Sequence, residues 1–320
     1  MAKKSKKHSR FVWHITQNFM KNINAILLTF ALSLIALKSY SSNRSKVDSL
    51  LHVLSTKSED TSKVNLLIKL SSYYNKRNPD SAFVLADQAL QLSKKINFKL
   101  GIASGNLMKA ESLLNTNEIT KAEEYLKLAY NQFTDLVNKN SKDYWAIKGL
   151  AGANGTYANL EESKGNLDKS LEYNKKSLAL KIKNGELQGA AFTYNNIGIN
   201  LSIQGKFYLA LENYFKALEI NKKLGNRFWQ TYNLSNIAGV YEAQGKFAQA
   251  LKIYFEILKI NEEDNEQLEM AHVYLHIGNL FFRQNKLEDA ENYYLKAKKI
   301  FDKENNKIQR VEPSHEIYLK

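Results

Sequence analysis

The chain has 320 residues, no cysteine and a formal net charge of +14. The absence of cysteine excludes disulfides, thiolate metal sites and a cysteine nucleophile. Half of the charge, +7, comes from residues 1–42, which contain no acidic residue, whereas basic and acidic residues are interspersed in the rest of the chain. Mixed charge is typical of solvated helix faces and not of a surface that follows nucleic-acid phosphates, so we predict no nucleic-acid partner.

The N-terminal segment, residues 1–42, has the composition of an export signal. Residues 25–37 form an uncharged apolar run, AILLTFALSLIAL, with basic residues before it and Ser39 and Ser41 after it. A bilayer-spanning helix needs about 20 apolar residues, whereas this shorter run has the size of a signal-peptide core. Translation from Met20 would give a signal of ordinary proportions.

Two main interpretations of this segment stay open, a cleaved signal peptide and an uncleaved membrane anchor, and a buried helix of the mature fold is a third. Both main interpretations place the rest of the chain outside the cytoplasm, either in the periplasm or anchored to the membrane. The protein would then contact the membrane only through its N-terminal segment. Residues 43–62, which are polar and rich in serine, are predicted to be a linker.

Residues 63–306 contain a repeated pattern, in which a small residue lies five positions after a turn residue. The turn positions are Arg77, Asn117, Gly165, Gly205, Gly245 and Asn285. The small residues are Ala82, Ala122, Ser170, Ala210, Ala250 and Ala290. The intervals between copies are about 40 residues, with one of about 48, and a period in this range indicates stacked helical hairpins.

The copy around Gly205 shows the helical pattern most clearly. Tyr194, Ile197 and Leu201 lie on one helical stripe before the turn, and Tyr214 and Ala217 lie on another after it. Glycine suits the end of a helix because it accepts a positive φ without strain, and asparagine at 285 can do the same. Short connections make neighbouring helices antiparallel, so each copy is predicted to be a helical hairpin. Strand-length alternation is absent, and we predict an all-α fold.

The pattern resembles the tetratricopeptide repeat. Three copies match the family pattern closely, at residues 191–224, 231–264 and 271–304, and three earlier copies match it more weakly. The matching features are the small residue of the first helix, the turn glycine, the aromatic residue two positions after it, and the later alanine and aromatic residue. The resemblance implies a right-handed α-solenoid that binds a protein or peptide and performs no catalysis. The family period is shorter, about 34 residues. These repeats are therefore extended, like those of exported regions of Bacteroidetes sensor kinases and regulators, which the stretch from Asn78 to Leu90 also resembles. Residues 307–320 would be a tail or an incomplete capping helix, either of a stand-alone protein or of a truncated sensor.

Two packing expectations follow from the repeats. We expect Gly198, Ala238 and Gly278 to permit close helix approach, while the tyrosines at 214, 254 and 294 fill the space between successive hairpins. The long interval requires eight extra residues, which we place within residues 133–146 as a longer connection.

Family groove positions, carried onto this sequence, predict the partner-binding residues. The predicted residues are Asn75, Asn115, Asn159, Asn195, Tyr232, Asn279 and Arg283. Further positions of the same kind are Tyr74, Glu111, Glu162, Phe192, Glu242, His272 and Phe282. Asparagine offers both a donor and an acceptor, so it can pair with the backbone of an extended peptide. The alternative is that asparagine is merely abundant on solvated helix faces.

The sequence contains no recognisable catalytic or cofactor motif. His272 and His276 have the spacing of a two-histidine metal site on a helix, but no further ligand is evident nearby, and we predict no metal. The glycines between 101 and 105 and between 149 and 155 do not follow a strand and lack the lysine and hydroxyl of a phosphate loop. We therefore predict a non-enzymatic interaction scaffold, with a sensory module as the alternative; the oligomeric state stays open.

Overall fold

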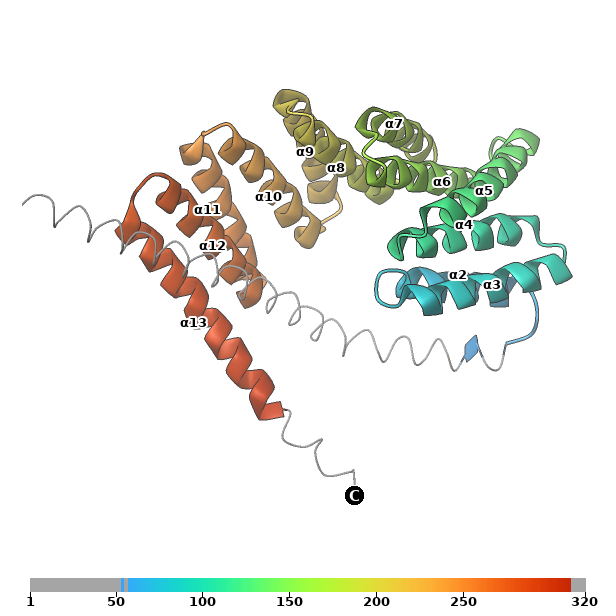
Figure 1. The fold of residues 1–320 in the computed structure, drawn as a ribbon, viewed down its shortest axis with the longest axis horizontal. Coiled ribbons are helices and arrows are strands. Elements are labelled where there is room, and N and C mark those ends of the chain that lie inside the picture. Colours follow the sequence, from blue (N-terminus) through green and yellow to red (C-terminus); the bar gives the residue numbers. More distant parts are fainter. Residues whose placement is uncertain (1–52, 55–56, 312–320) are drawn as a thin grey trace, which may run out of the picture. The chain divides into compact units, whose positions relative to one another are not determined.

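The computed structural model describes residues 53–54 and 57–311 of the chain. All regular secondary structure in these residues is helical, which confirms the predicted all-α class, whereas the predicted signal segment lies outside the described residues (Figure 1). The helices are α2 (Thr61–Tyr74), α3 (Pro79–Lys95), α4 (Lys99–Asn115), α5 (Ile119–Lys139), α6 (Tyr144–Ser163), α7 (Leu167–Lys183), α8 (Leu187–Ile203), α9 (Phe207–Lys223), α10 (Arg227–Ala243), α11 (Phe247–Glu263), α12 (Gln267–Arg283) and α13 (Leu287–Val311). Residues 52–297 form one compact unit.

Every helical hairpin from α4–α5 to α12–α13 is closed by a residue in the left-handed backbone region. Gly205 has φ +72°, and Asn285, which takes the place of glycine, has φ +58°. After Gly205 the amide of Lys206 donates to the carbonyl of Leu201 over 2.8 Å, which satisfies a carbonyl at the end of α8. Arg77 is an exception among the predicted turn positions, because its φ is not positive.

A second series of left-handed residues, which the sequence pattern did not single out, closes the connections between hairpins. The series consists of Asn97, Gly185, Gly225 and Asn265. The last three recur at the interval of the repeat itself, so both the turn within each hairpin and the turn between hairpins follow the repeat. Both turns fix the direction in which the next helix leaves.

The long interval is accommodated by longer helices, contrary to the expected longer connection. Helices α5 and α6 have 21 and 20 residues, whereas α7 to α12 have 17 each. Only residues 140–143 lie between α5 and α6. Residues 138 and 139 therefore belong to the end of α5, and residues 140–143 form a short connection. Asp143 caps the start of α6, because its carboxylate accepts from the amides of Trp145 and Ala146.

The repeated small residues are buried, as the periodicity predicts, and they allow helices to approach each other. Ala210 and Ala250 are fully buried, and Ser170 has the same environment. A Cβ atom added to Gly198 would lie 2.5 Å from Cε1 of Tyr214, and one added to Gly278 would lie 2.7 Å from Cε1 of Tyr294. The rings of Tyr214 and Tyr294 thus pack against the glycine of their own hairpin, which corrects the expectation that they fill the space between successive hairpins. The ring of Tyr254 stacks on His276 of the next hairpin, as expected.

The first helices of the hairpins form a common face. Helices α2 and α4, α4 and α6, and α8 and α10 contact each other directly, in addition to the contacts within hairpins. We call the surface of α2, α4, α6, α8, α10 and α12 the first-helix face. Within the described part of the chain, no helix has the length and apolar character needed to cross a membrane.

Candidate functional site

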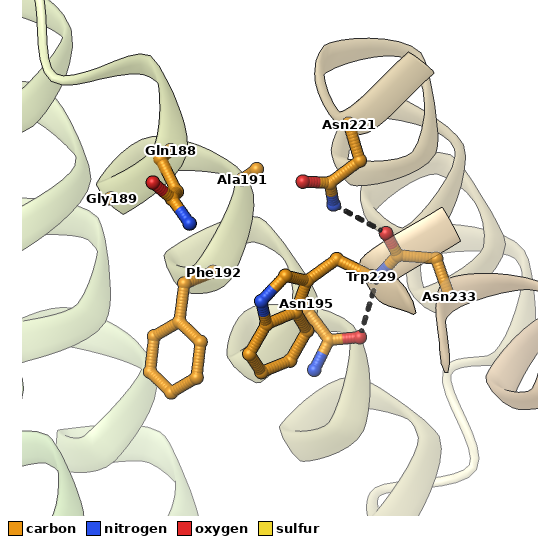
Figure 2. A pocket seen from close by; sticks show the side chains of 8 residues that line it. All are labelled: Gln188, Gly189, Ala191, Phe192, Asn195, Asn221, Trp229 and Asn233. Carbon is orange, nitrogen blue, oxygen red and sulfur yellow. Dashed lines mark hydrogen bonds between the residues drawn. The ribbon is translucent and has the colours of Figure 1, made fainter. Parts of the chain in front are cut away.

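The first-helix face contains a small cavity where α8, α9 and α10 meet (Figure 2). Its volume is about 240 Å³. The lining residues are Gln188, Gly189, Ala191, Phe192, Asn195, Asn221, Trp229 and Asn233. This volume lies below the range of about 300–1,000 Å³ typical of small-molecule pockets, and none of the lining residues carries a charge. The cavity therefore suits an uncharged group about the size of a side chain.

A directional chain of side-chain amides forms one wall of the cavity. Asn221 Nδ2 donates to Asn233 Oδ1 over 2.8 Å, and Asn233 Nδ2 donates to Asn195 Oδ1 over 3.0 Å (Figure 2). Asn236 Nδ2 donates to the same oxygen of Asn195 over 2.8 Å. Two donors on one oxygen fix the orientation of the Asn195 amide, because turning it would bring three NH₂ groups together.

The chain of amides ends in a donor without an acceptor. Asn195 is 1% exposed, and its Nδ2 atom has no hydrogen-bond partner among the residues that the structure describes. Leaving a buried donor unsatisfied costs about 1–3 kcal/mol. Such groups are uncommon in folded proteins, and a ligand acceptor is one way in which this cost is relieved.

Aromatic side chains form the opposite wall and the rim. Trp229 meets Phe192, Phe228 and Tyr232 edge to face, with ring centroids 5.6, 5.5 and 5.3 Å away. Phe192 is 43% exposed, Phe228 63% and Tyr232 41%. We call these four side chains the aromatic cluster. An exposed cluster of this kind is typical of interaction surfaces, where tryptophan and tyrosine often dominate the binding energy.

The predicted groove residues lie in several different environments along the first helices. Asn195 and Tyr232 belong to the cavity region described above. Asn115 Nδ2 donates to the carbonyl oxygen and to Oδ1 of Asn75, over 2.8 and 3.0 Å, so this pair links the ends of α2 and α4. Asn279 Oδ1 accepts from the hydroxyl of Tyr294 over 2.8 Å.

The remaining two predicted residues are exposed. The Asn159 side chain is solvent-exposed on α6. Arg283 on α12 pairs with Glu242 on α10, with 3.5 Å between Nη1 and Oε2, and its guanidinium lies over the ring of Phe247. Of these seven predicted residues, Asn195 lines the cavity and Tyr232 contacts Trp229 beside it. The other five lie outside the cavity lining: Asn75, Asn115, Asn159, Asn279 and Arg283.

Glu111 is the most strongly perturbed carboxylate of the first-helix face. Burial raises the pKa of Glu111 to about 7, although a hydrogen bond from Thr156 and the nearby Lys181 oppose the shift. Its oxygens accept from Thr156 Oγ1 over 3.1 Å and from Asn75 Nδ2 over 3.2 Å. Burial lowers the pKa of Lys181, whose ammonium donates to Thr193 Oγ1 over 2.7 Å. Glu111 thus joins α2, α4 and α6 by hydrogen bonds that its neutral form can also accept.

The raised pKa of Glu111 predicts a pH dependence of stability. Between pH 4.5 and about 7 the unfolded state has released this proton while the folded state retains it, so the free energy of unfolding falls as pH rises through this window. Glu111→Gln is expected to raise the free energy of unfolding at pH 8 by about 2 kcal/mol and to flatten the dependence. Urea unfolding between pH 5 and pH 8 measures both effects. Glu124→Gln, at an exposed carboxylate of α5, is the matched control; equal behaviour of the two variants would contradict the assignment.

The histidine pair does not form a metal site with other residues of the described chain. The imidazole of His276 stacks on the ring of Tyr254, with centroids 5.3 Å apart and an angle of 10°. No group of three or more potential ligands gathers in the described residues. His276 therefore takes part in packing between α11 and α12.

Sequence reasoning missed Trp229, Asn221, Asn233 and Asn236 as site residues. A signal existed in the spacing, because Asn233 and Asn236 both lie close to one full repeat after Asn195. Positions separated by nearly one repeat lie on neighbouring turns of adjacent first helices, since each hairpin stacks on the next.

Comparison with known proteins agrees with this architecture. Residues 230–303 match the family model of the tetratricopeptide repeat. No curated protein sequence matches the chain. The match assigns residues 230–303 to the tetratricopeptide repeat family, and the other described helices repeat the same hairpin architecture.

Solved structures show the same fold. BtubC from P. vanneervenii has a TM-score of 0.61 at 18% identity, covering 71% of this chain and 92% of that one. A signal transduction ATPase with a tetratricopeptide repeat sensor, from Pyrococcus horikoshii, has a TM-score of 0.63 at 17% identity, covering 81% of this chain and 39% of that one. A Rap protein complexed with competence and sporulation factor has a TM-score of 0.57 at 17% identity, covering 85% and 74%. At these identities the likeness establishes the fold.

Proposed function

We propose that this protein is a non-enzymatic interaction scaffold, which holds an extended segment of a partner protein on the first-helix face around α8 and α10. The observation that carries the proposal is the aromatic cluster beside a cavity lined by buried amides. Partly exposed aromatic side chains offer a large contact area at a low cost in side-chain entropy. The side-chain amides that line the cavity can form hydrogen bonds with uncharged polar groups of the partner.

The proposed partner is a protein or peptide and not a nucleic acid. The cavity contains no lysine or arginine to contact a phosphate. Acidic residues also lie near the basic groups of the surrounding face, as at Arg283 and Glu242. The tetratricopeptide fold is widely used to present such surfaces in repeat proteins.

A sensory role is the alternative form of this proposal. Two of the similar structures support it by what their names state: one is a signalling ATPase with a tetratricopeptide repeat sensor, and another is a Rap protein complexed with a factor. In this form the bound segment would be a signal that controls an output domain. Both forms require the same binding surface.

We also propose that the protein acts outside the cytoplasm, in the periplasm or anchored to the membrane. The support is the apolar run at 25–37 with its preceding basic residues. N-terminal sequencing of the protein from the envelope fraction is expected to give a mature chain that begins shortly after Ser39. A chain that begins at Met1 or Met20 would rule out cleavage and leave the anchored form, and recovery from the cytoplasm alone would contradict export.

The binding proposal is tested by crosslinking and capture from the envelope fraction, with the wild-type protein and Trp229→Ala side by side. A partner retained by the wild type and lost from the variant is expected. Trp145→Ala, which removes an exposed tryptophan from α6, serves as the control and is expected to retain the partner. Equal capture by all three proteins would contradict binding at α8 and α10.

A further inference from the structure

The cavity at α8, α9 and α10 indicates which chemical group of the partner segment it accepts, an inference that rests on the proposed function. The amide chain from Asn221 through Asn233 to Asn195 runs in one direction and ends in an unpaired NH₂ donor. In Figure 2 this nitrogen of Asn195 points away from Asn233. A group that completes the chain must therefore bring a hydrogen-bond acceptor.

The absence of charged residues in the cavity lining disfavours an ionised acceptor. All eight lining residues are neutral, and Asn195 itself has almost no contact with solvent. Bringing a carboxylate to such a position without a cationic partner costs several kcal/mol. The partly buried Lys181, whose side chain lies beside Gly189, donates from its ammonium to Thr193 Oγ1. A neutral carbonyl oxygen is thus favoured over a carboxylate.

The size of the cavity and the depth of its donor favour a side chain over the peptide backbone. The volume of about 240 Å³ is below the range of about 300–1,000 Å³ typical of small-molecule pockets, so it suits one side chain better than an extended backbone with its flanking side chains. Asn195 is 1% exposed, so only a slender group reaches it. The rings of Phe192 and Trp229 would flank the methylene groups of such a side chain.

We propose that the cavity receives the side-chain amide of a glutamine or asparagine from the bound segment, with its carbonyl oxygen accepting from Asn195 Nδ2. The aromatic cluster then binds the residues on either side of this amide. The chain of three amides becomes a chain of four, and the unpaired donor is satisfied. Specificity for an amide arises because a segment without an acceptor leaves that donor buried and unpaired.

An array of short random-sequence peptides, probed with the full-length wild-type protein, tests this proposal. Glutamine or asparagine is expected at one fixed position in the retained peptides. In a retained peptide that carries glutamine at this position, methionine in its place should weaken binding at least about tenfold, because methionine has similar length and no strong acceptor. The γ-methyl ester of glutamic acid, which keeps the carbonyl and lacks the NH₂ group, should bind within about threefold of glutamine.

The variant Asn195→Asp separates this contact from a general effect on folding. It replaces the free donor by an oxygen while keeping the acceptor for Asn233 and Asn236. Binding of the ester peptide should fall at least about tenfold, whereas glutamine can turn its NH₂ group toward the new oxygen. Asn200→Asp is the matched control, because Asn200 lies on the same helix, is equally buried and does not line the cavity. Circular dichroism checks that both variants keep their helices.

The outcomes separate this inference from the proposed function. Retained peptides without an enriched amide, or an ester peptide that binds Asn195→Asp as tightly as wild type, would overturn the amide site and leave the interaction scaffold intact. An array that retains no peptide would overturn both.

Discussion

Gly149→Ala is expected to lower the free energy of unfolding by about 1–2 kcal/mol, although alanine is the better helix former. A Cβ atom at this position would lie 2.0 Å from Cε1 of Phe133, and the Phe133 ring is 1% exposed and has little room to move. Overpacking of this kind typically costs about 1–3 kcal/mol and exceeds the gain of up to about 1 kcal/mol from helix propensity. Urea unfolding followed by circular dichroism measures the difference.

The matched control lies on the same helix. Gly155→Ala places its new atom 3.7 Å from Ser177 Oγ, an ordinary contact, and should stabilise α6 by about 0.5–1 kcal/mol. A double-mutant cycle with Phe133→Ala isolates the clash, because Gly149→Ala should become neutral or stabilising once the ring is removed. If Gly149→Ala costs the same with and without the Phe133 ring, the packing of α5 on α6 is not as described.

Trp229→Ala is expected to weaken binding of the partner segment at least about 30-fold, which corresponds to about 2 kcal/mol. Trp229 lines the cavity and contacts the other three members of the aromatic cluster, so its removal opens the cavity and releases Phe192, Phe228 and Tyr232 together. Isothermal titration calorimetry with the segment identified by capture measures the change.

The control for this prediction is Trp145→Ala, at an exposed tryptophan on a different first helix, α6. Trp145 contacts Tyr144 and Lys148 on α6 and does not line the cavity. Its removal should leave the affinity within about threefold, because scattered surface residues away from a hot spot contribute little. A larger loss from Trp145→Ala than from Trp229→Ala would place the binding surface at α6 instead.

The regular features of the fold were predictable because they repeat. A left-handed residue commonly closes a helix that ends in a tight turn, so Gly205 and Asn285 mark their hairpins in the sequence itself. The buried small residue five positions later follows from the same geometry, as Ala210 shows. The repeat period indicates that the hairpins stack, and the family resemblance adds that the stack is a right-handed solenoid.

The irregular features were not predictable, because they depend on contacts between neighbouring hairpins. The extra residues between Phe133 and Ala146 extend two helices, and no local pattern distinguishes that outcome from a longer loop. Asn195, Phe192 and Tyr232 were expected among other first-helix positions, but no sequence pattern indicated that Asn195 and Phe192 line one cavity with Tyr232 beside it. The direction of the amide chain depends on how α8 lies on α10, which fixes the pairing of Asn195 with Asn233 and Asn236.

The central claim, that the first-helix face around α8 and α10 holds a partner segment, is tested most directly by site-specific photocrosslinking in the envelope. A benzoylphenylalanine is placed either at Tyr232, beside the cavity, or at Phe215, which is similarly exposed but lies on the second helix α9. Mass spectrometry then maps the crosslinked peptide of the partner. One continuous segment crosslinked from position 232 and absent from position 215 is the predicted result; crosslinking of the same segment from position 215 alone would contradict the account.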